Sequence, residues 1–491
     1  MRSEVSSLDK PRSFRAQSRN ARPTAPKPLL DFARSERIWG ALACGVLALS
    51  TPAHAAEPTP YQRALAAGYK AAFLCSGMFN AGRTQAQIEA LELTGIYAEY
   101  DPIVPTLPAQ VDAGAHTVSV AFDPKLPPRR AEWHLGLGCT TMPIGAPPQA
   151  AVAANGPPAA VPAPLDPRPW PLGDAGISPR PGSALARLAD QAFAGGYGQG
   201  SRTVGVLVVR DGKVIAERYG DGFGPTVSNR TWSVAKSISG TLVGIAAKQG
   251  LLDPAQPARV PEWGPASVDP RTGIKLDNLL RMASGLHSDT AGNRTDALYT
   301  GATTVTGEVT HWPLEAMPGT RFRYANNDIL LAIRSLRAAL NDDQRYLAFP
   351  RTELFDRIGM THTVAETDWQ GNFILSSQVW STARDLARLG LLWLNDGVWQ
   401  GERILPEGWV KYMTTPSGPQ PEKGEGYGAT MWLFGPAQGL PAGSYAAQGN
   451  RGQYIMVIPS ERLVVVRRGE DPVGARFDIA KFSADVAAAL R

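Results

Sequence analysis

The chain has 491 residues, which is too long for one average domain and suggests two or more. Its composition, 43% hydrophobic and 19% charged, is typical of a globular protein with sizeable cores. The net charge of +5 arises in residues 1–55, which hold nine Lys and Arg against four Asp and Glu. The remainder is neutral, so the charge gives no case for a nucleic-acid partner.

The first 55 residues have the order of a secretory signal peptide: a basic segment, an apolar run over residues 38–49, and small residues at the end. We expect cleavage after Ala55. The apolar run is too short to span a bilayer, so no stable membrane anchor is expected after cleavage. These features predict a periplasmic or secreted bacterial protein. The alternative is an N-terminal amphipathic or anchor segment.

Export would remove Cys44 with the leader and leave Cys75 and Cys139 in an oxidising compartment. An even pair there favours a disulfide between them. Two buried free thiols are the alternative. The six histidines show no spacing typical of metal ligands, so neither a metal nor a cofactor is expected.

Residues 57–142 combine helical patterns over 61–79 and 84–93 with a strand-like run over 116–122, which predicts a small N-terminal α+β domain. Both remaining cysteines fall inside it. Residues 143–181 are dominated by Pro, Ala and Gly, a composition that favours an extended linker.

Residues 182–491 form the longest globular segment and begin with a helical pattern over 184–194. Two β-rich runs on either side of Asp211 and Gly212 predict a hairpin. Helical sequence then dominates until strand patterns return over 427–434, 453–458 and 462–468, before a last helix over 478–490. Strands at both ends of a helical insertion predict an antiparallel sheet in which early and late strands pair.

The segment 232–247 contains the first candidates for chemistry. Its apolar residues recur at helical spacing, so it predicts a helix that begins near Ser233, with Lys236 on the same face. A serine hydroxyl becomes a nucleophile when a nearby base takes its proton. A lysine can do this when burial lowers its pKa, and the helix N-terminus stabilises developing negative charge.

A Ser-x-x-Lys match alone is weak, because about one is expected by chance in a chain of this length. Ser7 and Lys10 form such a match in the predicted leader. The alternative for Ser233 is an N-cap serine followed by a surface lysine.

A second pair, Tyr324 and Asn326, lies in a turn-rich loop before a helix predicted over 329–340. Two residues apart in a loop, both side chains can face one cavity. A tyrosine beside lysines can act as general base or acid through a lowered pKa. An asparagine amide can hold both a lysine and a substrate carbonyl. Alone, the pair is more simply a packed tyrosine and a turn asparagine.

In this order, these segments resemble the penicillin-recognising serine hydrolases: class C β-lactamases, their esterase relatives and 6-aminohexanoate-dimer hydrolase-like enzymes. The resemblance covers residues 185–491 and extends to three longer segments, 274–286, 381–397 and 452–459. It implies an α/β (α+β) fold of the β-lactamase/transpeptidase type, in which helices flank an antiparallel sheet and an all-helical subdomain is inserted.

The same resemblance implies the roles of individual residues. Ser233 would be the nucleophile, Lys236 its partner, Tyr324 the general base or acid and Asn326 a polar support. The backbone N–H groups of Ser233 and Asn450 would form the oxyanion hole, beside Gly449, where a backbone approaches the substrate closely.

The sequence departs from the family pattern at Ala447, where the family usually has a Lys or His that binds a substrate carboxylate. The absence of this Lys or His favours small neutral esters or amides as substrates over β-lactams or cell-wall peptides. Arg451 could supply a nearby charge, although a solvated residue at a strand end is the simpler interpretation.

Three functions therefore compete. The first is an exported serine hydrolase that cleaves small ester or amide substrates through a Ser233 acyl-enzyme. The second is a β-lactamase or DD-peptidase. The third is a penicillin-binding sensor that is acylated without turnover; the presence of Ser233, Lys236 and Tyr324 together disfavours an inert scaffold.

Overall fold

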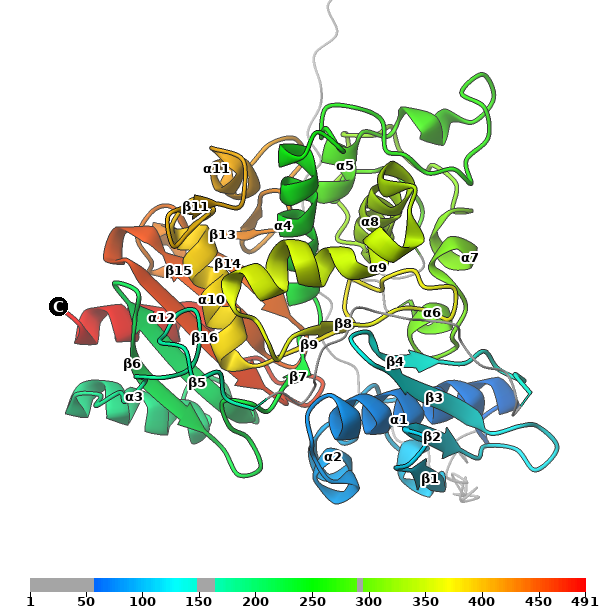
Figure 1. Ribbon diagram of the computed structural model, residues 1–491, viewed down its shortest axis with the longest axis horizontal. Helices are drawn as coiled ribbons and strands as arrows, with labels where there is room; N and C mark the ends of the chain where they lie inside the picture. Colours follow the sequence, from blue (N-terminus) through cyan, green and yellow to red (C-terminus); the bar gives the residue numbers. More distant parts are fainter. Residues whose placement is uncertain (1–56, 148–163, 289–294) are drawn as a thin grey trace, which may run out of the picture. The chain divides into compact units, whose positions relative to one another are not determined.

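The computed structural model describes residues 57–147, 164–288 and 295–491 (Figure 1). The predicted signal peptide and its cleavage site lie outside the described residues. Within the described part of the chain, no helix combines the length and the apolar character needed to cross a membrane.

A seven-stranded antiparallel sheet forms the centre of the region predicted as globular from residue 182. Its strand order is β12-β13-β14-β15-β16-β5-β6. The strands are β5 (Thr203–Arg210), β6 (Lys213–Tyr219), β12 (Gly426–Tyr427), β13 (Trp432–Phe434), β14 (Ser444–Gly449), β15 (Gln453–Ile458) and β16 (Leu463–Gly469). Because β5 pairs with β16, the predicted pairing of early and late strands is confirmed.

The hairpin predicted around Asp211 and Gly212 is confirmed as β5 and β6. Both turn residues have positive φ, 49° and 77°, which is the geometry that favours Asp-Gly in a two-residue hairpin turn. The single strand predicted over 427–434 is instead two short strands. Thr430, with φ of 66°, turns the chain between them.

Helices cover both faces of this sheet (Figure 1). Helices α3 (Ser183–Phe193) and α12 (Ile479–Ala489) pack on one face, and α4 (Val234–Lys248) and α10 (Ala383–Leu394) on the other. β5 is consequently buried along almost its whole length rather than alternately. Gly390 lets α10 lie close, since a Cβ there would be 2.5 Å from a methyl carbon of Val464.

The predicted helical insertion lies between α4 and α10. Its helices are α5 (Leu276–Leu280), α6 (Asp296–Tyr299), α7 (Val305–Val309), α8 (Asn326–Leu340) and α9 (Asp343–Pro350). A small sheet beside it contains β7 (Asn229–Arg230), β9 (Val379–Ser381) and β8 (Val364–Ala365). Beyond α10 follow β10 (Val398–Trp399), β11 (Glu402–Arg403) and α11 (Trp409–Thr414).

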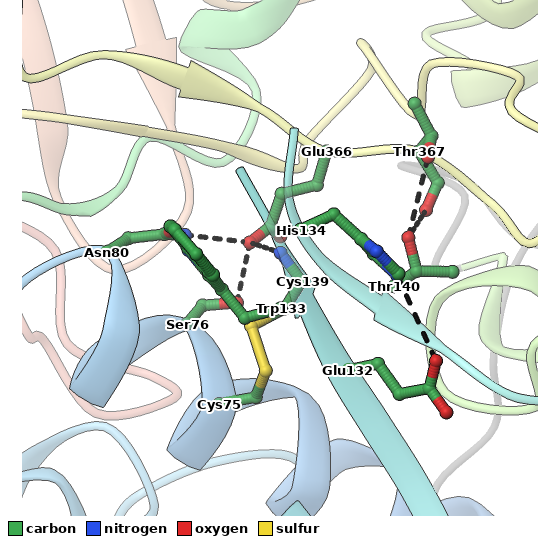
Figure 2. Close-up of a disulfide and its surroundings, with 10 residues drawn as sticks. All are labelled: Cys75, Ser76, Asn80, Glu132, Trp133, His134, Cys139, Thr140, Glu366 and Thr367. Carbon is green, nitrogen blue, oxygen red and sulfur yellow. Dashed lines mark hydrogen bonds and ion pairs between the residues drawn. A yellow bond between two sulfur atoms is a disulfide. The ribbon is translucent and has the colours of Figure 1, made fainter. Parts of the chain in front are cut away.

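The N-terminal residues from 57 form two helices and a four-stranded sheet, with α1 packed on the sheet and α2 packed on α1. The elements are α1 (Pro60–Phe79), α2 (Gln85–Leu91), β1 (Ala109–Asp112), β2 (Thr117–Val120), β3 (Arg129–His134) and β4 (Gly138–Thr141). Both helices begin with a Thr capping box. The expected disulfide is present and joins Cys75 on α1 to Cys139 on β4 (Figure 2). The hydrophobic core of this part also includes Trp232 and Trp380 from the later chain.

After residue 163, the Pro- and Ala-rich segment packs against the later chain and is not an extended linker. The Trp170 indole N–H donates to the Gly212 carbonyl over 2.8 Å. Asp174 is buried and forms ion pairs with Arg388 at 2.9 Å and Arg384 at 3.4 Å. Buried ion pairs of this kind hold residues 166–175 against α10, which composition alone does not predict.

Candidate active site

Ser233 lies at the N-cap position of α4, at the end of a tight turn. The preceding residue, Trp232, has φ of 50°, a conformation that is costly for a bulky side chain and needs support from its surroundings. That support comes from packing: the Trp232 ring lies 5.8 Å from the Phe73 ring and 4.2 Å from the Arg230 guanidinium carbon. The N-terminal helix α1 therefore helps to hold the turn that presents Ser233.

Lys236 lies one turn further along α4 and is buried, with 1% of its surface exposed. Its Nζ is 2.9 Å from the Ser233 Oγ, 2.5 Å from the Asn326 Oδ1 and 2.9 Å from the Ser376 carbonyl oxygen. A neutral amine has two N–H donors and one lone pair. Two donations, to Asn326 and Ser376, leave that lone pair for the Ser233 hydroxyl proton.

Burial lowers the pKa of Lys236 from 10.5 to about 7, and the positive charge of Arg230 contributes to the same shift. Arg230 is itself buried and donates to the Ser377 hydroxyl over 2.8 Å. Near neutral pH, a large fraction of Lys236 is therefore the free amine, the form that can accept a proton. The surface lysine considered as the alternative is excluded by the burial of this side chain.

Tyr324 and Asn326 reach the same site from the start of α8. The Tyr324 ring centroid is 5.0 Å from the Lys236 Nζ, and the ring packs against Trp432 in a tilted arrangement with the centroids 5.3 Å apart. The expectation of a lowered pKa at Tyr324 is wrong. Burial raises its pKa above the ordinary value, and a hydrogen bond with Ser233 offsets only part of that effect. A neutral phenol is a proton donor, which leaves Lys236 as the group suited to accept the first proton.

The end of β14 lies against the start of α4 at Gly449. A Cβ on Gly449 would lie 2.3 Å from the Thr231 carbonyl oxygen and 3.1 Å from the Ser233 amide nitrogen. Glycine is required because two backbone segments meet there, and the approach of this backbone to substrate stays a prediction. This contact brings the predicted oxyanion residues Ser233 and Asn450 to one cavity.

The position of the missing family cation, Ala447, is fully buried in the core. The next residue of β14, Gln448, lines the cavity, and its Nε2 is buried without a hydrogen-bond partner among the residues that the structure describes. A buried amide donor without a partner is costly, so this carboxamide is well suited to bind a polar group of a ligand.

Arg451 does not supply the replacement charge, and it is not a solvated residue; both expectations are wrong. It is 4% exposed, and its guanidinium pairs with Glu470 at 2.9 Å. The side chain also donates to the Leu91 carbonyl over 2.7 Å, in the N-terminal part of the chain. A positive φ of 54° at Arg451 belongs to the turn between β14 and β15.

These residues surround a cavity of about 260 Å³. The predicted residues Ser233, Tyr324, Asn326, Gly449 and Asn450 all line it. The remaining lining residues of the described chain were not predicted as site residues: Tyr97, Trp232, Tyr299, Ser377, Trp432 and Gln448. Trp232 and Gln448 could have been found from their neighbours, since they directly precede Ser233 and Gly449 in the chain. No local pattern marks the other four, because residues of unrelated segments meet only after folding. No group of three or more His, Cys, Asp and Glu residues that could hold a metal is found in the described ranges.

Comparison with known proteins identifies relatives of this region. The family model "Beta-lactamase" matches residues 185–467. A 6-aminohexanoate-dimer hydrolase from Paenarthrobacter ureafaciens is 29% identical over 299 residues, which are 54% of this chain and 72% of that protein. Two solved structures share the fold. A candidate 6-aminohexanoate-dimer hydrolase from Bacillus anthracis has a TM-score of 0.52 and 22% identity, over 62% of this chain and 82% of that one.

The second structure is a candidate β-lactamase from Bacteroides dorei DSM 17855, with a TM-score of 0.51 and 20% identity over 63% of this chain and 98% of that one. These matches agree with the expected fold, an antiparallel sheet flanked by helices with a helical insertion. The family match spans more than half of the chain and includes the turn at Ser233 and the β14–β15 edge. The chain belongs to the beta-lactamase family and is a hydrolase with the fold of that family.

Proposed function

We propose that the protein is an exported serine hydrolase that cleaves small ester or amide substrates through an acyl-enzyme on Ser233. The observation that carries this proposal is the 2.9 Å contact between the Ser233 Oγ and a buried Lys236 amine with a pKa of about 7. A hydroxyl beside an amine that is largely neutral at physiological pH is an activated nucleophile.

The reaction follows from these contacts. The Ser233 Oγ attacks the substrate carbonyl while its proton moves to the Lys236 Nζ, and the carbonyl oxygen becomes an oxyanion bound by the amides of Ser233 and Asn450. When the C–N or C–O bond breaks, the neutral phenol of Tyr324 donates a proton to the leaving group and regains one from Lys236. Water then hydrolyses the acyl-serine, which releases the acid and restores the hydroxyl.

The lining of the cavity supports the substrate class. Aromatic rings of Trp232, Tyr299 and Trp432 provide apolar walls, and the carboxamides of Gln448 and Asn450 provide hydrogen bonds. Apolar walls with a few polar groups are typical of sites for small molecules. The similarity to a 6-aminohexanoate-dimer hydrolase favours linear amides among these substrates.

The central test compares Ser233→Ala with Ser335→Ala, a buried helical serine whose hydroxyl donates to a carbonyl one turn back. A fluorophosphonate probe should label the native protein and Ser335→Ala, but not Ser233→Ala. Turnover of p-nitrophenyl butyrate or the linear 6-aminohexanoate dimer should fall by about 10³-fold or more with Ser233→Ala. Labelling that survives Ser233→Ala would overturn the proposal. Turnover of nitrocefin alone would favour the β-lactamase function instead.

Export is the second part of the proposal. The leader-like sequence before Ala56 and the disulfide between Cys75 and Cys139 support it, because disulfides persist in oxidising compartments. N-terminal sequencing of the protein from a bacterial periplasm or culture medium should begin at Ala56. An intact N-terminus in the cytoplasmic fraction would contradict export without affecting the proposed chemistry.

A further inference from the structure

A loop that lies outside the family match reaches the active-site cavity. Residues 92–97 follow α2 and end at Tyr97, and they are named here the Tyr97 loop. The Tyr97 side chain lines the cavity beside Gly449 and Asn450, and the Asn450 Nδ2 donates to its hydroxyl over 3.3 Å. The family model begins only at residue 185, so this wall is additional to the region it matches.

The Tyr97 loop is seated against the later chain by packing and backbone contacts. Leu93 and Ile96 are buried in the N-terminal core. Gly95 has φ of 60°, and a Cβ there would lie 2.5 Å from the Pro472 Cβ. Glycine therefore allows a close approach that another residue would prevent. The Val473 N–H also donates to the Gly95 carbonyl over 2.8 Å.

Arg451 holds the end of α2 and the Tyr97 loop in place through hydrogen bonds. Its guanidinium donates to the Leu91 carbonyl over 2.7 Å and to the Thr94 carbonyl over 3.2 Å, while Glu470 balances its charge at 2.9 Å. A guanidinium is suited to this because its donors lie in a fixed plane. Arg451 follows Asn450 directly, so the turn between β14 and β15 contains both a proposed oxyanion amide and the side chain that holds the Tyr97 loop.

We propose that Tyr97 is a specificity-determining residue whose ring closes one side of the cavity and restricts the acyl chain to short groups. Arg451 is a positioning residue that acts through Tyr97. In a cavity of about 260 Å³, one aromatic ring is a substantial part of the boundary, so its removal opens space for a longer chain. This inference rests on the proposed Ser233 acyl-enzyme.

The test measures kcat/KM for p-nitrophenyl acetate and p-nitrophenyl hexanoate. Tyr97→Ala should raise the hexanoate-to-acetate ratio about tenfold or more, because the longer chain gains room. Tyr97→Phe, which keeps the ring, should leave that ratio within about threefold. Tyr61→Ala is the matched control: Tyr61 lies in the same N-terminal part, 55% exposed and away from the cavity lining.

The role of Arg451 is tested by a double-mutant cycle on the same ratio. Arg451→Lys keeps a charge for Glu470 but cannot hold the carbonyls in the same way, so it should raise the ratio in the same direction. Added to Tyr97→Ala, it should change the ratio no further, because both act through one ring. If Arg451→Lys does not fold, Gly95→Ala is used instead, because its Cβ would displace the Tyr97 loop from Pro472.

The labelling rate of Ser233 by a fluorophosphonate separates the two proposals. If Tyr97→Ala is still labelled but its hexanoate-to-acetate ratio is unchanged or lower, the role of Tyr97 is overturned. Ser233 would then still stand as the nucleophile. Additive effects of Arg451→Lys and Tyr97→Ala would overturn the positioning role of Arg451. Activity that survives Ser233→Ala would instead remove the acyl-enzyme on which both rest.

Discussion

The buried amine of Lys236 makes the pH dependence of the Ser233 reaction a quantitative prediction. With an ordinary pKa of 10.5, only about 3 in 10,000 lysines are neutral at pH 7, whereas a pKa of about 7 makes about half neutral. Burial therefore increases the population of the reactive form roughly 1,500-fold at neutral pH. Below pH 6, the rate of acylation should fall about tenfold for each pH unit, because the protonated amine cannot accept the serine proton.

The assay is the second-order rate of fluorophosphonate labelling between pH 5 and pH 9, which reports acylation without deacylation. Lys236→Arg places a permanent charge at the same position and should reduce the rate by about 10³-fold or more at pH 8. Lys248→Arg is the matched control, since Lys248 is exposed at the other end of the same helix. A rate that is flat below pH 7, or a midpoint near pH 10, would refute the reasoning. So would a Lys236→Arg rate within tenfold of the native rate.

Three further predictions concern the structure around the site. Burial raises the pKa of Glu366 from 4.5 to about 7, although Ser76, Asn80 and the Cys139 amide donate to it (Figure 2). The folded protein therefore retains a proton that the unfolded chain releases above pH 4.5, and this contribution to stability, roughly 3 kcal/mol, is lost as the pH rises through 7. The free energy of unfolding, measured with urea, should decrease between pH 5 and pH 8, and in Glu366→Gln this decrease should be smaller by about that amount. An equal decrease in the native protein and the variant would contradict the burial argument. Replacing both Cys75 and Cys139 by Ala should lower the unfolding free energy by about 4 kcal/mol, because the bridge closes a loop with a sequence separation of 64; a loss below about 1 kcal/mol would contradict this. Gly449→Ala should reduce kcat about 10²-fold or more, because its Cβ would push β14 away from the start of α4, whereas Gly224→Ala, with open space at its Cβ position, should leave kcat within about twofold.

The residues closest to the chemistry could be predicted because they belong to short segments with strong local signals. Ser233 and Lys236 are three apart on one helix, so the period of the helix alone places them on one face. The hairpin at Asp211 and Gly212 was predictable for a similar reason, since its turn geometry depends on those two residues. The resemblance of several ordered segments to one family supplied the relation of Tyr324 and Asn326 to that helix.

The sequence by itself therefore determined the family, the pairing of early and late strands and the helix that carries Ser233, since these follow from local pattern and motif order. Only the tertiary structure decided the electrostatics and the walls of the site. The pKa of Lys236 is lowered by its burial and by the charge of Arg230. The pKa of Tyr324 is raised because the effect of burial is larger than that of the hydrogen bond with Ser233. Tyr97 lines the cavity next to Asn450 although more than 300 residues separate the two in the chain, so no local pattern predicts their contact. Desolvation and close packing are sums over residues distant in the chain, so they exist only once the chain has folded.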